Sequence, residues 1–95
     1  MDSKWYIVRG ERSGVFFGHI AKRDGPEVEM TDARQIWYWD GAANLLQMAA
    51  EGVKKPEECK FTQSVELLTL TDAIEVLPCT EAAAACIHAV PVWKV

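Results

Sequence analysis

The fold is decided by the stretch 4–22, KWYIVRGERSGVFFGHIAK, which holds two runs of aromatic and β-branched residues on either side of a short polar turn. Such runs are typical of strands, so the stretch predicts a β-hairpin with strands over 4–10 and 14–22. Side chains alternate between the two faces of a strand, and the second run places Phe17 on one face and Phe16 on the other. We therefore expect this strand to be covered on both faces.

Two further strands are predicted after the hairpin. Residues 24–26, Asp-Gly-Pro, are a turn signal, and residues 27–30 then alternate charged and apolar side chains as a half-exposed strand does. Residues 31–32 separate this strand from a fourth one over 33–39. These patterns together predict an antiparallel meander of four strands.

A long helix is predicted over 41–52. Asp40 is its expected N-cap and Gly52 its expected C-terminal stop. The polar residues inside it lie at i, i+3 and i+7 and are Asn44, Gln47 and Glu51. Because this stripe is narrow, we expect most of the helix to be buried against a second sheet, another helix or a subunit interface.

The C-terminal part predicts two strands and a short helix. The strands cover 65–70 and 73–77, and the helix begins at Thr80 as N-cap and ends before Pro91. A chain of 95 residues has room for one hydrophobic core, so we expect a single domain over 1–95. The predicted fold is α+β, an antiparallel sheet with one long buried helix and one short C-terminal helix.

Charge and composition argue against several classes of function. Lys and Arg number 10 against 14 Asp and Glu, and this net charge of -4 argues against a protein that binds duplex nucleic acid. No apolar run approaches the ~18 residues of a membrane span and no signal peptide is recognisable, so we expect a cytoplasmic protein without a membrane partner. The three cysteines form no CxxC pair, and we expect no metal and no cofactor.

Catalytic signatures are weak in this sequence. The serines lack the surroundings of a nucleophile, and neither a GxGxxG nor a Walker sequence occurs. His19 alternates with core residues, which fits a structural histidine better than a general base. Glu27 and Glu29 share a strand face, as paired catalytic carboxylates would, but a solvated strand face has the same pattern. We expect no catalytic residues.

Trp37, Tyr38 and Trp39 form a row of large rings directly before the predicted long helix. The small residues 41–43 would expose the N–H groups of the helix start beside an aromatic surface, which suits a nucleotide base and its phosphate. Asp40 offers the opposite interpretation, in which its carboxylate caps the helix and repels phosphate. Both interpretations stay open on the residues alone.

Five segments together resemble a family of small phage-encoded proteins that includes the anti-Thoeris sponges. They are SGVFFG at 13–18, RQIWYWDGAA at 34–43, EGVK at 51–54, CKF at 59–61 and VPVW at 90–93. Those sponges bind and sequester immune signals of the cyclic ADP-ribose type. The resemblance implies an oligomeric α+β protein, for example a hexamer, without catalytic activity, and in some members a second site for cyclic oligonucleotides.

The resemblance and the residues together predict sequestration of a cyclic ADP-ribose-type or cyclic oligonucleotide signal near the first hairpin and the aromatic strand. A ring, Trp37 or Phe16, would stack on adenine, arginines would meet the phosphates, and small or amide residues would complete the polar contacts. The predicted ligand-binding residues are Arg9, Arg12, Ser13, Phe16, Arg34, Trp37, Trp39, Gly41, Ala42 and Asn44. The competing prediction is a protein-interaction module in which Trp37, Trp39 and Trp93 anchor a host factor.

Overall fold

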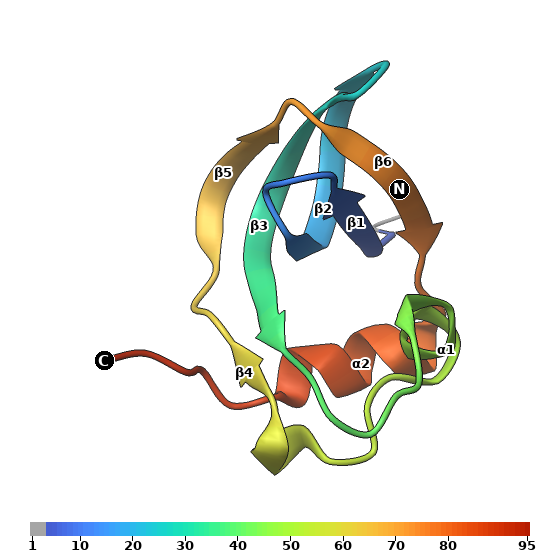
Figure 1. Ribbon diagram of the computed structural model, residues 1–95, viewed down its shortest axis with the longest axis vertical. Coiled ribbons are helices and arrows are strands. Elements are labelled where there is room, and N and C mark those ends of the chain that lie inside the picture. The colour runs from blue at the N-terminus through green and yellow to red at the C-terminus, as the bar shows by residue number, and fades with distance from the viewer. Residues whose placement is uncertain (1–3) are drawn as a thin grey trace.

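The computed structural model describes residues 4–95 as a curled antiparallel sheet with two helices across one of its ends (Figure 1). Its elements are the strands β1 (Tyr6–Gly10), β2 (Val15–Asp24), β3 (Glu27–Tyr38), β4 (Lys60–Phe61), β5 (Val65–Leu70) and β6 (Ala73–Pro78), the helices α1 (Leu45–Glu51) and α2 (Glu81–Ala89), and the 3-10 turn η1 (Pro56–Glu58). The predicted α+β class with an antiparallel sheet is confirmed. Residues 1–3 of the predicted domain lie outside the described residues.

The first hairpin forms as predicted, with β1 antiparallel to β2, and a turn at Gly25 leads on to β3. The prediction of separate strands over 27–30 and 33–39 is wrong, because β3 runs through Asp32. Asp32 lies in the left-handed region with a φ of 49°, and the pairing with β2 shifts register beside it. Aspartate tolerates this conformation better than most residues, so the strand bends there instead of ending.

β5 and β6 form where the sequence predicts them, but they pair with the two opposite edge strands of the β1–β2–β3 meander. β5 lies beside β3, with Leu68 opposite Met30, and β6 lies beside β1, with Val76 opposite Val8. The short connection at 71–72 therefore spans the two edges, and the sheet curls into a half-open barrel (Figure 1). One hydrophobic cluster fills the inside of this curl, with Val8, Phe16, Val28, Met30, Ala33 and Leu70 as its buried members.

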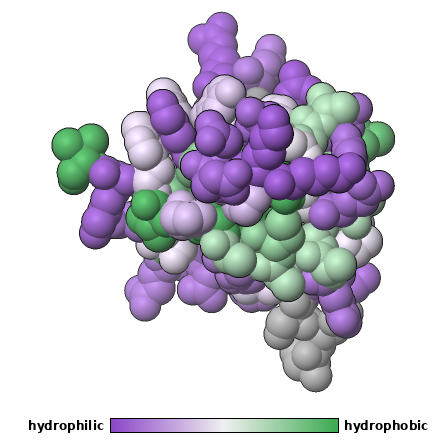
Figure 2. Space-filling view, turned by 90° about the horizontal axis from the view of Figure 1, so that it is seen from below, coloured by the Kyte–Doolittle hydropathy of each residue, from purple (hydrophilic) through white to green (hydrophobic). Residues whose placement is uncertain are grey.

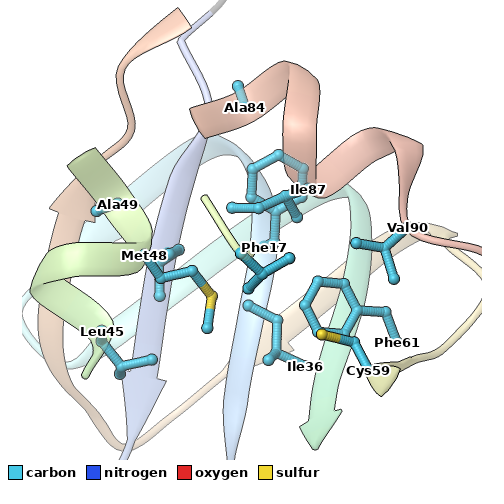
Figure 3. Packing of buried hydrophobic residues seen from close by; sticks show 12 residues of the cluster. Phe17, Ile36, Leu45, Met48, Ala49, Cys59, Phe61, Ala84, Ile87 and Val90 are labelled. Carbon is cyan, nitrogen blue, oxygen red and sulfur yellow. The ribbon is translucent and has the colours of Figure 1, made fainter. Parts of the chain in front are cut away.

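A second hydrophobic cluster packs both helices against the other face of the meander (Figure 3). Leu45 and Met48 of α1 and Ile87 of α2 point toward Phe17 of β2 in this view. Because Phe17 belongs to this cluster and Phe16 to the other, both faces of β2 are covered, as the sequence predicts.

α1 is shorter than predicted, with seven residues that begin at Leu45. Its N-cap is Asn44, whose side-chain Oδ1 accepts the Gln47 N–H at 2.9 Å. Asp40 lies four positions before this cap and does not start the helix. The predicted long helix and its predicted N-cap are therefore wrong.

The chain before α1 is kept out of helical geometry at Gly41. This residue has a φ of 93°, and its carbonyl accepts the Lys54 N–H at 3.1 Å. A Cβ at Gly41 would lie 2.5 Å from the Lys54 nitrogen, so only glycine fits this close approach. α1 ends at Gly52 as predicted, but Leu46 on its outer side is 62% exposed, so only one face of α1 is buried.

The short C-terminal helix α2 is confirmed. Its predicted N-cap Thr80 accepts the Ala83 N–H through Oγ1 at 3.0 Å. The same hydroxyl donates to Ala50 O at 2.8 Å, and the Thr80 N–H donates to Ala49 O at 3.0 Å. These bonds join the start of α2 to α1.

The turn of the first hairpin is tied to the connection between β5 and β6 by one carboxylate. Asp72 accepts the Ser13 hydroxyl at 2.6 Å, the Arg12 N–H at 2.7 Å and the Ser13 N–H at 3.2 Å. These donors hold the pKa of Asp72 below its ordinary value of 3.8, the Ser13 hydroxyl most strongly. The bonds stabilise the folded state only while the carboxylate is ionised.

We predict that Asp72→Ala lowers the urea midpoint of unfolding at pH 7. A group whose pKa is lowered on folding contributes its full stability above its ordinary value, and this contribution is lost as the pH falls through the lowered value. The urea midpoints of the variant and the native protein should therefore approach each other as the pH falls below about 3.8. Asp24→Ala, in the other exposed hairpin turn, is the control, and an equal loss in that variant would contradict the role of Asp72.

Candidate functional site

A groove of about 390 Å³ opens between β1, β6 and the start of α1. We call it the Arg9 groove, and its lining includes Arg9, Val15, Trp39, Asn44, Leu46 and Glu75. The fold thus brings Arg9, Trp39 and Asn44, which are predicted ligand-binding residues, to one place. Glu75 was not predicted as a site residue, because charged and apolar side chains alternate along β6 as they do in any half-exposed strand.

Arg9 is placed in the groove by strand pairing. It lies opposite Val15 of β2 and Glu75 of β6. The Arg9 Nη1 is 3.7 Å from Glu75 Oε1, and both side chains are partly exposed. An exposed ion pair contributes only ~0–1 kcal/mol, so the guanidinium can turn to a ligand anion at little cost in stability.

Trp39 and Asn44 are held by hydrogen bonds that also shape the chain before α1. The Trp39 Nε1–H donates to Ala42 O at 3.1 Å, and the half-buried ring packs against the cluster under the helices. Asn44 uses its Oδ1 to cap α1, which leaves its amide nitrogen as a donor for a ligand. The groove therefore combines a cation, a carboxylate, an indole ring and an amide donor.

Four other predicted residues support the surroundings of the groove. The turn residues Arg12 and Ser13 are bound to Asp72 through their N–H groups. Gly41 O accepts the Lys54 N–H, and Ala42 O accepts the Trp39 indole. In this structure the four residues shape the loops around Arg9 and Trp39.

The predicted phosphate site on the N–H groups of residues 41–43 does not form. The Ala43 N–H donates to Gln47 Oε1 at 2.8 Å. The helix begins only at Leu45 and has seven residues, so its dipole is small and its start is already capped. This part of the prediction is wrong, because the segment is a loop where the sequence predicts a helix.

The two rings predicted to stack on adenine, Phe16 and Trp37, both lie outside the groove. Phe16 is buried in the cluster inside the curl, so the prediction that it stacks on a ligand is wrong. Trp37 is 60% exposed and stacks on Trp93, with ring centroids 6.1 Å apart and planes 12° from parallel. The ring available in the Arg9 groove is Trp39.

Arg34 is a buried residue with a structural role, and it lies outside the Arg9 groove, so the two predicted arginines do not meet at one site. Its Nε donates to Thr62 O at 2.8 Å, its Nη1 to the carbonyls of Ile87 and Val90 at 3.1 Å, and its Nη2 to Phe61 O at 3.2 Å. The side chain is only 7% exposed, and burial lowers the pKa of its guanidinium. Arg34 thereby fixes the end of α2 and the β4 segment to β3.

A second cavity, of about 410 Å³, lies on the α2 side of the sheet and was missed by the sequence analysis. We call it the Arg34 cavity, and its lining includes Trp5, Phe17, Asp32, Arg34, Ser64 and His88. Trp5 stacks on His19 with centroids 3.7 Å apart, and the His19 Nδ1 lies 2.7 Å from Lys4 O. His19 is thus a structural histidine. The lining comes from distant segments, so no local pattern could have revealed it.

Asp32, Ser64 and His88 in the Arg34 cavity are the residue types of a hydrolytic triad. Within the described chain, however, no hydrogen bond joins any two of these side chains. Nucleophilic catalysis requires a base in contact with the nucleophile. These three side chains therefore do not form a hydrolytic triad in this structure.

Comparison with known protein families gives a match over most of the chain. The model of a family described as a domain of unknown function, DUF6948, matches residues 3–87. Neither a curated protein nor a solved structure matches the chain. No helix within residues 4–95 is long and apolar enough to cross a membrane, and the same residues form no cluster of three or more side chains suited to a metal ion.

We predict that Arg34→Met destabilises the fold by about 3 kcal/mol or more, because it leaves buried carbonyls without a charged donor. Arg9→Met should change the free energy of unfolding by no more than about 0.5 kcal/mol, since its ion pair is exposed. Urea unfolding of the two variants measures the difference. If both variants lost the same free energy of unfolding, the conclusion that Arg34 is structural and Arg9 is not would be contradicted.

Proposed function

We propose that this chain, which belongs to the DUF6948 family, is a non-catalytic protein that sequesters a cyclic ADP-ribose-type or cyclic oligonucleotide signal in the cytoplasm of the host cell. The ligand would occupy the Arg9 groove. The observation that carries the proposal is the convergence of Arg9 with Trp39 and Asn44, which lie 30 or more positions further along the chain, around one space of about 390 Å³.

The groove is chemically complementary to a nucleotide. An indole such as Trp39 offers a face on which a base can stack. A guanidinium such as Arg9 matches phosphate oxygens, and a carboxylate such as Glu75 can accept hydrogen bonds from ribose hydroxyls. The Asn44 amide donor would then complete the contacts at the base. A ligand with a base, a ribose and a phosphate satisfies all four groups at once.

The groove offers little chemistry for turnover. Among the described residues, its lining contains no serine, cysteine or histidine that could act as a nucleophile. Two cysteines elsewhere are not activated, since burial raises the pKa of Cys59 and raises that of Cys79 from 9.0 to about 11. Binding without cleavage is the function these groups support.

Calorimetry or native mass spectrometry against a panel of cyclic nucleotide signals tests the proposal. We expect Arg9→Gln to weaken binding by a factor of roughly ten to a hundred, because one charged contact is lost. Asn44→Asp should also weaken binding while α1 stays capped, since aspartate caps as well as asparagine. Arg23→Gln, on the distant end of β2, is the control.

Two outcomes would overturn this assignment. If no signal in the panel binds more tightly than ~10 µM, sequestration fails as a function. If a signal binds but Arg9→Gln, Asn44→Asp and Arg23→Gln all bind it equally well, the function stands and the groove is the wrong site. Recovery of a cleaved product would establish an enzyme instead.

We also infer that the protein forms a homodimer or a higher oligomer through the outer side of α1. Leu46 and Ala50 of α1 and Leu77 and Pro78 of β6 line a shallow apolar depression. Hydrophobic side chains also gather between hydrophilic ones on the face that carries the helices (Figure 2). A large exposed apolar side chain such as Leu46 beside an apolar depression is typical of a subunit interface.

Light scattering at micromolar concentration tests this interface. We expect the native protein to be an oligomer and Leu46→Glu to dissociate it, because a charge would be buried at the contact. Leu67→Glu on β5 is the matched control, since Leu46 and Leu67 are 62% and 61% exposed. A monomeric native protein would contradict oligomerisation. If only Leu67→Glu dissociated the oligomer, the interface would lie at β5 and not at α1.

Protein recognition is the second candidate function, and the exposed ring pair favours it. Trp37 and Trp93 are 60% and 39% exposed and stacked, and Lys60 Nζ lies 5.6 Å from the Trp93 ring. Exposed Trp residues are common anchors of protein interfaces. Capture of one stoichiometric host protein that is lost in Trp37→Ser, with no nucleotide released on denaturation, would support this function over sequestration.

A further inference from the structure

We propose that the Arg34 cavity is a binding site for a small aromatic carboxylate. The cavity has a volume of about 410 Å³ and is open to solvent beside the end of α2. It shares no lining residue with the Arg9 groove, so this inference does not depend on the proposed function. Three features of its wall define the ligand: an unneutralised cation, an aromatic surface and a single carboxylate.

The cation is the guanidinium of Arg34. It is 7% exposed, and its bonds to four backbone carbonyls use four of the five N–H groups that arginine carries. The one ion pair among residues 4–95 joins Arg9 to Glu75, so no carboxylate of the described chain forms a direct ion pair with Arg34. A buried charge without a counter-ion is costly. An anion in the cavity would reduce this cost and could accept the remaining Nη2 N–H.

The aromatic surface is formed by Trp5 and the rings around it. Trp5 stacks on Phe17 at a centroid distance of 5.0 Å, with planes 10° apart. The His88 ring meets Trp5 edge-on at 4.1 Å. Phe17 is fully buried, while Trp5 is only partly buried, so the indole is held by Phe17, His19 and His88 and its remaining surface lines the cavity. Val90 adds an apolar side to the same cavity.

Asp32 limits the charge of the ligand. Its exposed carboxylate lines the same cavity, at the bend of β3, and repels a second negative charge. A carboxylate carries one negative charge, whereas phosphate carries up to two at neutral pH. The hydroxyl of Ser64 is a neutral donor, and either oxygen of a carboxylate can accept a hydrogen bond from it. The wall therefore favours a monoanion with a ring over inorganic phosphate.

His88 reports on the occupancy of the cavity. Desolvation lowers its pKa from 6.5, the positive charges of Arg34 and His19 lower it further, and Asp32 acts in the opposite direction. An anion bound beside Arg34 would offset the positive charges around the ring. The pKa of His88 should therefore rise when the cavity is filled.

The test is a titration of the native protein with benzoate, followed by NMR signals of the His88 ring and the Trp5 indole. Benzamide, which is neutral and of the same shape, and inorganic phosphate are titrated in parallel. We expect benzoate to shift both signals at a concentration roughly ten- to a hundredfold below that needed for benzamide. Benzoate, and not benzamide, should also raise the midpoint of the His88 pH titration.

Asp32→Asn supplies a variant that keeps the fold, because asparagine tolerates the left-handed conformation of this position. Loss of its charge should strengthen benzoate binding by roughly threefold. Asp24→Asn, a carboxylate at the far turn, is the matched control and should leave binding unchanged. Equal binding of benzoate and benzamide, equal binding of benzoate and phosphate, or the same affinity in Asp32→Asn as in Asp24→Asn would overturn the proposal.

Discussion

The hydrogen bonds of the Arg34 guanidinium are the constraint on which the arrangement of this domain depends. The last carbonyls of a helix lack partners within the helix and carry partial negative charge. Arg34 satisfies the carbonyls of Ile87 and Val90 at the end of α2 and those of Phe61 and Thr62 beside β4. One side chain of β3 therefore fixes a helix and an edge strand that are distant in sequence. Hydrophobic packing alone would not set their position so narrowly.

The same bonds also shape the Arg34 cavity and distinguish it from the Arg9 groove. With α2 held at β3, the Arg34 cavity is lined by Trp5 and His88, whose rings touch, and by the guanidinium of Arg34. The Arg9 groove borders the start of α1 and shares no lining residue with that cavity, and its arginine is partly exposed, with the Glu75 carboxylate 3.7 Å away. A buried and an exposed arginine thus serve different roles, although the sequence presents both as basic residues beside aromatic strands.

The sequence predicted correctly those elements that depend only on residues close together in the chain. The hairpin, the two strands at 65–70 and 73–77, and the Thr80 cap depend on alternation, turn residues and a side chain that reaches its own helix. The failures concern contacts between distant segments. Gly41 is held out of a helix by the Lys54 backbone, and β5 and β6 pair with opposite ends of the meander. The same limit applies to the site, because the carbonyls that accept the N–H groups of Arg34 lie 27 to 56 positions away in the chain.

The central claim is that Arg9 and Trp39 bind a nucleotide signal while Arg34 remains structural. The most direct measurement is a proton–nitrogen NMR spectrum of the labelled protein during titration with cyclic ADP-ribose and its relatives. The Arg9 Nε–H and Trp39 indole signals should shift together with one dissociation constant, while the signals of Arg34 and Trp37 stay in place. Shifts confined to Trp37 and Trp93, or to Arg34, would contradict this assignment of the site.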